Sequence, residues 1–78
     1  MTAYGRYQTM IINALARKLG PAATDFAKTS AKRANMRFED LTPETVEGFA
    51  ARVEENLTRY VPTGEAQFVA NTIRKLRA

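Results

Sequence analysis

The sequence has no cysteine and no histidine. Without cysteine there is no disulfide to stabilise a small fold and no thiolate to act as nucleophile or metal ligand. Without histidine the chain lacks the commonest general base, the commonest metal ligand and the side chain that titrates near neutral pH. A core of this size rarely provides more than about 3–5 kcal/mol of stability, so self-association is the remaining way to add to it.

Long apolar runs are also missing, and the longest is Met10-Ile11-Ile12. A membrane-spanning helix needs about 20 apolar residues, so we expect no membrane span. The first ten residues lack the charged-then-apolar layout of a signal peptide. The sequence therefore predicts a cytoplasmic protein, bacterial in style, with no membrane partner.

Catalytic constellations are absent as well. Without histidine no Ser-His-Asp relay exists, and Gly20 and Gly64 stand alone rather than in a phosphate-binding loop. The adjacent acids Glu39 and Asp40 precede an expected helix, where carboxylates usually complement the positive end of the dipole. We predict that the protein is not an enzyme and uses no cofactor, metal or small-molecule substrate.

What the chain does contain is a composition typical of one globular domain, with 78 residues, 45% hydrophobic and 26% charged. Its net charge of +4 is unevenly distributed. Residues 1–38 carry a net charge of +6, and residues 39–78 carry −2. The two halves should attract each other, within one chain or between two chains.

Apolar residues recur at steps of three and four, and no stretch alternates as a strand would. We expect helices at about residues 2–19, 21–37, 43–60 and 63–77. The sequence predicts an all-α fold, a four-helix-bundle-like single domain over residues 1–78, with dimerisation as one way to complete it.

Helix boundaries follow from a few residues. Gly20 is a suitable left-handed stop, and Pro21 suits the first position of the next helix. Thr42 and Pro43 form a similar start, and Thr63 can cap the last helix. The apolar sides of the last two helices are expected to include Val46, Phe49, Ala50, Val53, Leu57 and Tyr60, and Ala66, Phe68, Val69, Ala70, Ile73 and Leu76.

The helix at residues 21–37 has a small-residue side for close packing and a basic side. The inward residues are expected to be Ala23, Ala27, Ser30, Ala31, Ala34 and Phe38, and the outward ones Lys28, Lys32, Arg33 and Arg37. The basic side allows two interpretations. It is either a solvated face that can pair with acids of the third helix (Glu44, Glu47, Glu54 and Glu55), or the phosphate-contacting part of a DNA-binding helix.

A helix-turn-helix is supported by Ala16, which precedes Gly20 by four residues as in many such motifs. Lysines and arginines after the turn would contact phosphates. However, the front of the second helix offers Ala22, Thr24 and Asp25, whereas base reading uses arginine, lysine, asparagine or glutamine. We favour the solvated or paired face and keep DNA binding as the alternative.

Leu19, Gly20, Pro21 and Ala23 form a short L-G-P-x-A-like motif, and Val61-Pro62 precedes a last helix that contains Phe68. In these features the sequence resembles a small all-helical domain found in bacterial signalling proteins. The resemblance covers about residues 12–76. It implies a role in signal transduction and supplies no site residues.

We therefore predict a non-catalytic protein–protein interaction module, with a homodimer as the expected assembly. On the basic side, the candidate partner-binding residues are Lys28, Lys32, Arg33 and Arg37. Met10 and Met36 project from the apolar arcs of their helices, and exposed methionine suits adaptable contacts. A small helix-turn-helix DNA-binding regulator is the alternative function.

Overall fold

A computed structural model describes residues 4–76, and over this range the fold is all-α. Two short 3-10 helices interrupt the connections, η1 (Gly20–Ala22) and η2 (Phe38–Asp40). The four α-helices are α1 (Arg6–Leu19), α2 (Ala23–Arg33), α3 (Val46–Leu57) and α4 (Thr63–Lys75).

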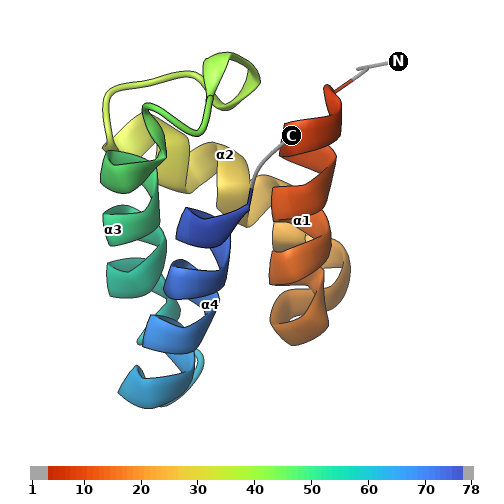
Figure 1. The fold of residues 1–78 in the computed structure, drawn as a ribbon. Coiled ribbons are helices and arrows are strands. Elements are labelled where there is room, and N and C mark those ends of the chain that lie inside the picture. Colours follow the sequence, from red (N-terminus) through yellow and green to blue (C-terminus); the bar gives the residue numbers. More distant parts are fainter. Residues whose placement is uncertain (1–3, 77–78) are drawn as a thin grey trace.

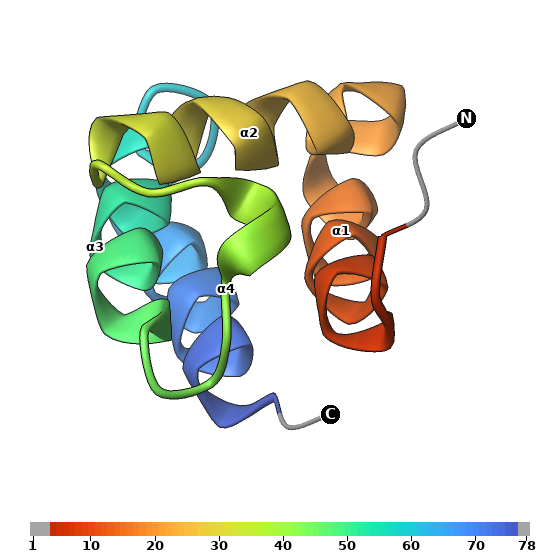
Figure 2. The same ribbon diagram turned by 90° about the horizontal axis from the view of Figure 1, so that it is seen from above.

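The helices do not form a simple four-helix bundle. α1, α3 and α4 stand side by side, and α2 lies across them on one side of the molecule (Figures 1 and 2). α3 and α4 make the most extensive contact of any helix pair. The expected all-α class is confirmed, but the bundle-like arrangement has three aligned helices and one crossing helix.

The hydrophobic core lies where the three aligned helices meet α2. Small side chains on α2 let it approach closely, since Ala23, Ala27 and Ala31 are at most 2% exposed. Large residues of the other elements fill the space beneath them. These are Ile11, Leu15, Phe38, Phe49, Val53, Leu57 and Ile73.

Gly20 makes the turn between α1 and α2. Its φ of +60° lies in the region that favours glycine, and its N–H donates to the carbonyl oxygen of Ala16. The expected stop at Gly20 is thus observed. The α-helix that follows begins at Ala23 rather than at Pro21, because residues 20–22 tighten into a 3-10 turn.

The end of α2 is earlier than expected, at Arg33 instead of residue 37. Asn35 adopts a φ of +59°, and the N–H of Met36 donates to the carbonyl oxygen of Ala31. This is the left-handed termination that asparagine tolerates after a helix. Arg37 consequently lies outside the helix, and Phe38 enters the core from η2.

One buried polar side chain holds the connection between α2 and α3. The Nε2 of Gln8 on α1 lies 3.3, 3.2 and 2.8 Å from the carbonyl oxygens of Phe38, Glu39 and Leu41. Gln8 is only 6% exposed, so these contacts satisfy carbonyl groups that water does not reach freely. Composition and periodicity had pointed to no such role.

α3 is shorter than the expected range at both ends. It begins at Val46, after a turn in which the Thr42 N–H donates to Oγ1 of Thr45 at 3.0 Å. It ends at Leu57, whose carbonyl oxygen accepts from the N–H groups of Tyr60 and Val61. Tyr60 therefore leaves the helical register and is 67% exposed, so its expected core position was wrong.

α4 begins at Thr63, where the sequence predicts a helix start, and ends at Lys75. Its buried side comprises Ala66, Val69, Ala70 and Ile73. Phe68 was expected on this side, but it is 70% exposed. The expected boundaries at residues 2 and 77 lie outside the described residues.

Candidate interaction surfaces

The six residues expected to bind a partner do not form one surface. Lys28, Lys32 and Arg33 are exposed on α2, and Arg37 lies past its end. Arg37 is paired within the chain, with its Nη2 3.2 Å from Oε2 of Glu39. The four basic residues therefore do not share one surface, because three lie on α2 and Arg37 lies past its end beside Glu39.

Lys28 lies against the start of α1. Its Nζ is 5.9 Å from the centroid of the Tyr4 ring, within the range of a cation–π contact. The pKa of Lys28 is raised above its ordinary value because the Tyr4 hydroxyl stabilises its ammonium form, while Asp25 and Glu39 add weaker attraction. Lys28 therefore faces away from the groove described below.

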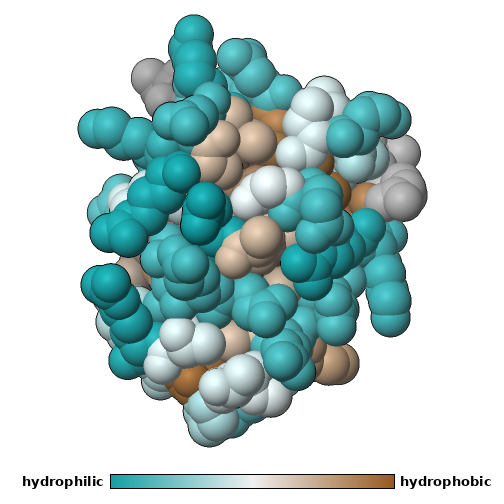
Figure 3. Space-filling model, turned by 90° about the vertical axis from the view of Figure 1, so that its left-hand side faces the viewer, coloured by the Kyte–Doolittle hydropathy of each residue, from teal (hydrophilic) through white to brown (hydrophobic). Residues whose placement is uncertain are grey.

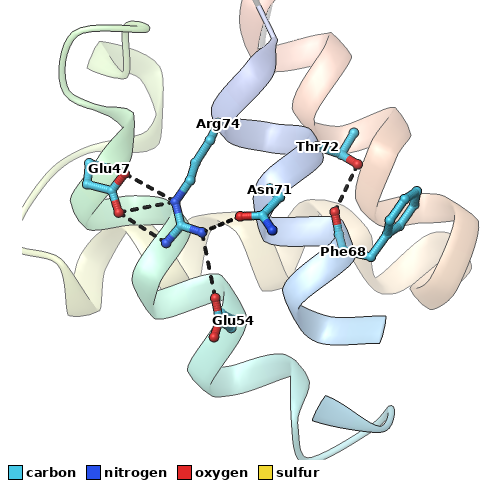
Figure 4. Close-up of polar contacts among 6 residues, drawn as sticks. All are labelled: Glu47, Glu54, Phe68, Asn71, Thr72 and Arg74. Atoms are coloured by element: carbon cyan, nitrogen blue, oxygen red, sulfur yellow. Dashed lines mark hydrogen bonds and ion pairs between the residues drawn. The ribbon is translucent and has the colours of Figure 1, made fainter. Parts of the chain in front are cut away.

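The acids of α3 are paired mainly with α4 rather than with α2. Arg74 lies between Glu47 and Glu54, with contacts of 3.0 Å and 3.7 Å (Figure 4). Glu55 pairs with Arg52 at 3.5 Å. Within residues 4–76, no ion pair joins the α2 cations to the α3 acids. Of the two forms expected for the basic side, solvated or paired with the third helix, the pairing is therefore not observed within one chain.

The face on the α3 side of the molecule is largely hydrophilic, with small separate apolar patches (Figure 3). The basic and acidic halves of the chain do meet elsewhere. Lys18 of α1 donates to Oε1 of Glu65 of α4 at 2.6 Å, although both side chains are partly exposed. Exposed pairs of this kind contribute about 0–1 kcal/mol.

A groove of about 510 Å³ opens where the end of α1, the outer side of α2 and the end of α3 converge. We call it the basic groove. Its lining includes Lys18, Phe26, Arg33, Asn56, Arg59 and Tyr60.

Two aromatic rings belong to the apolar part of the basic groove, together with Leu19 and Ala22. Phe26 and Tyr60 meet edge to face, with ring centroids 6.2 Å apart and planes at 73°. Beside them, the Nδ2 of buried Asn56 donates to Oγ of Ser30 at 3.3 Å, which joins α3 to α2. Packing and this buried hydrogen bond therefore support the groove from below.

Positive charge dominates the edges of the basic groove. Lys18, Arg33 and Arg59 line it, against the single acid Asp25. Lys18 is engaged by Glu65, but neither Arg33 nor Arg59 forms an ion pair with any residue in the described range. Two guanidinium groups thus line the same groove as half-buried Phe26 and exposed Tyr60.

A second groove, of about 370 Å³, runs between α1 and α4. We call it the apolar groove. Its lining includes Met10, Ala14, Phe68, Val69, Thr72 and Leu76. Met10 was expected to be a partner-binding residue, and the structure places it here, half-buried.

Met36 does not project from the surface as expected. It is half-buried and packs against the core. Its Cε is 3.7 Å from the position that a Cβ on Gly48 would occupy, so it lies beside α3. The left-handed turn at Asn35 directs the chain back over the domain, so Met36 packs against the core, and its contact with a partner stays a prediction.

Several residues that line the two grooves were not expected at a partner-binding surface. Tyr60 and Phe68 were expected in the core, and Lys18 and Arg59 were not among the expected partner-binding residues. Phe68 could have been found from helical angles, because it lies about 100° from Val69 and well outside the buried arc of α4. The position of Tyr60 depended on where α3 ends, which the periodicity did not reveal.

Within residues 4–76 there is no cluster of three or more potential metal-ligating side chains. No helix in this range is both long enough and apolar enough to cross a membrane. Comparisons with family models, curated proteins and solved structures find no match to this chain. The resemblance to the domain of bacterial signalling proteins therefore stays a prediction.

Proposed function

We propose that this chain is a non-catalytic protein–protein interaction module that binds an acidic segment of a partner protein in the basic groove. The observation that carries the proposal is the position of Arg33 and Arg59, which lack ion-pair partners in the described residues, beside half-buried Phe26 and exposed Tyr60. A role in signal transduction is part of the proposal and comes from the sequence resemblance.

The chemistry of the groove favours a ligand with both carboxylates and an apolar side chain. Arginine binds carboxylates through paired donors, and tyrosine and arginine are enriched among residues that dominate binding energy at interfaces. The aromatic rings supply apolar area, and the cations select for negative charge and speed the encounter. A neutral or basic segment would leave Arg33 and Arg59 without partners.

DNA binding is the second candidate, because Lys28, Lys32 and Arg33 are all exposed along α2. Ala22, the last residue of η1, and Thr24 and Asp25 in the first turn of α2 still do not suit base recognition. If nucleic acid binds, we expect contacts to phosphates with a steep loss of affinity at higher salt.

The test is an NMR titration of ¹⁵N-labelled protein with a synthetic peptide of glutamate and phenylalanine. A second peptide carries glutamine in place of glutamate, and a random DNA duplex is titrated separately. We expect the acidic peptide to shift the amide signals of Phe26, Arg33, Arg59 and Tyr60, and the neutral peptide to have little effect. Stronger binding of the duplex than of the acidic peptide at physiological salt would favour DNA binding.

A matched pair of variants separates the groove from the overall charge. Arg59→Glu and Arg52→Glu change the net charge equally, but only Arg59 lines the basic groove. We expect Arg59→Glu to weaken acidic-peptide binding at least about tenfold, as loss of a central interface arginine does. Equal weakening by Arg52→Glu would mean that net charge, rather than the groove, attracts the peptide.

A further inference from the structure

α4 carries four outward-facing residues in a symmetric order. Glu65, Phe68, Thr72 and Lys75 are spaced by three, four and three residues, so they form one stripe along the helix. Glu65, Phe68 and Lys75 are exposed, and Thr72 is half-buried. Figure 4 shows Phe68 extending from the side of α4 opposite to Arg74, which faces α3.

The intervals between the four residues are the same in either chain direction, and the residues at the two ends, Glu65 and Lys75, have opposite charges. If a second copy of α4 is laid antiparallel on the first, Glu65 faces Lys75 of the second copy and Phe68 faces Thr72. The arrangement has twofold symmetry, so each contact occurs twice. In the parallel orientation, like residues would face each other, including the two Glu65 and the two Lys75 side chains.

The apolar groove provides a place for the opposing Phe68. Because Lys18 pairs with Glu65 near the start of α4, α1 runs antiparallel to α4 (Figure 1). The other end of the groove is therefore formed by Met10, Thr72 and Leu76, all of which line it. Phe68 of the second copy, placed opposite Thr72, would fill this end.

Covering the stripe leaves few polar groups without partners. The Thr72 hydroxyl already donates to the carbonyl oxygen of Phe68 at 2.9 Å (Figure 4). Lys18 contacts only Oε1 of Glu65, so Oε2 can accept a hydrogen bond from Lys75 of the second copy. Arg17 and Lys18 add positive charge near Glu65, at the start of α4. The negative charge of Glu65 is therefore needed to offset the repulsion between these cations and Lys75 of the second copy.

The available area matches a modest interface. A standard interface buries about 800 Å² on each partner, which is about one-sixth of the 4916 Å² accessible surface of this chain. The molecule measures 31 × 25 × 21 Å, so one face is large enough. We propose that the face formed by α1 and α4 binds a second copy of this chain, with the two α4 helices antiparallel.

Sedimentation equilibrium over a series of protein concentrations tests this dimer. We expect the wild type to be a concentration-dependent dimer and Phe68→Ala to weaken it at least about tenfold, as for a central aromatic at an interface. Tyr60→Ala is the matched control, because Tyr60 is 67% exposed and Phe68 70%, and Tyr60 lies outside this face. A wild type that stays monomeric, or equal weakening by both substitutions, would overturn the proposal.

A charge exchange tests the antiparallel register. In a dimer of the Lys75→Glu variant, the new carboxylate faces Glu65 of the second copy. In a dimer of the Glu65→Lys variant, the new ammonium group faces Lys75. Each variant alone should therefore dimerise at least about tenfold more weakly than the wild type. When the two variants are mixed, every facing pair is again opposite in charge, and the dimer mass should return. A mixture that remains as monomeric as its components would contradict this register.

Lys18 lines both grooves, but the substitutions at Phe68, Glu65 and Lys75 change residues outside the lining of the basic groove, so the two proposals can fail separately. Phe68→Ala should leave binding of the acidic peptide unchanged, and Arg59→Glu should leave the dimer unchanged. Circular dichroism shows whether each variant retains its helices. The exposed positions of these side chains favour folding of all of them.

Discussion

Tyr60 and Phe68 are almost equally exposed aromatic residues, but they became exposed in different ways. Tyr60 is outside because α3 ends at Leu57 and the chain turns. Phe68 is outside because of its angle within an uninterrupted helix. Each borders a groove, and the surroundings of the two rings differ in charge. An exposed aromatic therefore indicates a contact surface, whereas its neighbours indicate which partner would fit.

The two grooves differ in whether residues of this same chain could neutralise their charges. The basic groove has Arg33 and Arg59 on its edges and only Asp25 among its lining residues as an acid, so it favours a foreign acidic ligand. The stripe on α4 carries both Glu65 and Lys75, so a second copy can satisfy it. This difference in charge pattern leads us to propose a partner protein at one groove and self-association at the other.

The largest predicted effect removes the support that both grooves share. Phe49 is fully buried beneath α2 and η2, and Phe49→Ala should cost about 3–5 kcal/mol. Because that approaches the whole stability of a core this small, we expect a mostly unfolded chain with both binding activities lost. Urea denaturation followed by circular dichroism measures this. Retention of wild-type stability would show that the core is not organised around this ring.

A smaller loss is expected at Gln8, which lies away from both grooves. Gln8→Ala removes the donor that three carbonyl groups share, and we expect a loss of about 1–3 kcal/mol in the free energy of unfolding. The folded fraction should still bind at both grooves. Gln67→Ala, at an exposed position on α4, is the control and should stay within about 0.5 kcal/mol of the wild type. Equal effects at the two positions would argue against the bridging role of Gln8.

Gly48 offers a change in the opposite direction. It lies exposed inside α3, and an added Cβ would meet only Met36 at an ordinary contact distance of 3.7 Å. Gly48→Ala should therefore stabilise the domain by about 1 kcal/mol, raising the midpoint of thermal unfolding. Gly20→Ala, at a φ of +60°, should instead destabilise it. Destabilisation by both would mean that Met36 has no room to adjust.

The substitutions with the smallest expected effects on stability test most directly whether the two grooves act separately. Phe68→Ala should change the free energy of unfolding by no more than about 0.5 kcal/mol, and Tyr60→Ala, which also removes the contact with Phe26, by about 1 kcal/mol. Tyr60→Ala should weaken acidic-peptide binding and leave the dimer intact, and Phe68→Ala should do the reverse. Peptide titration measures the first effect and sedimentation equilibrium the second, and both are carried out on both variants. If one substitution removed both activities, the two grooves would not act as separate surfaces.

Much of the fold could be predicted from the sequence, because helix-ending residues, helix-starting residues and apolar spacing act over a few neighbouring positions. Gly20 stops α1, Thr63 begins α4, and the apolar spacing over Val46–Leu57 places the right residues of α3 inside. The ends of α2 and α3 were less predictable. Asn35 adopts a left-handed conformation and α3 ends one turn before Tyr60, and both depend on how the following segment packs.

The candidate surfaces were only partly predictable. Arg33 and Met10 were identified, and each lies on one of the two grooves. Lys28 lies over the Tyr4 ring, Arg37 pairs with Glu39, and Met36 packs against the core. A helical pattern places residues on sides of a helix, but it does not say which neighbouring helix or loop will cover each side.

The sequence by itself determined that this chain is helical, because periodic apolar residues and helix-ending residues act over a few neighbouring positions. It also determined the absence of cysteine and histidine chemistry. Only the tertiary structure decided that α2 crosses the other helices and that Arg74 pairs with Glu47 and Glu54 of α3. It also decided that Arg33, Arg59 and Tyr60 line one groove. These arrangements depend on contacts between residues far apart in the chain, where the close packing of small residues on α2 selects one geometry among many.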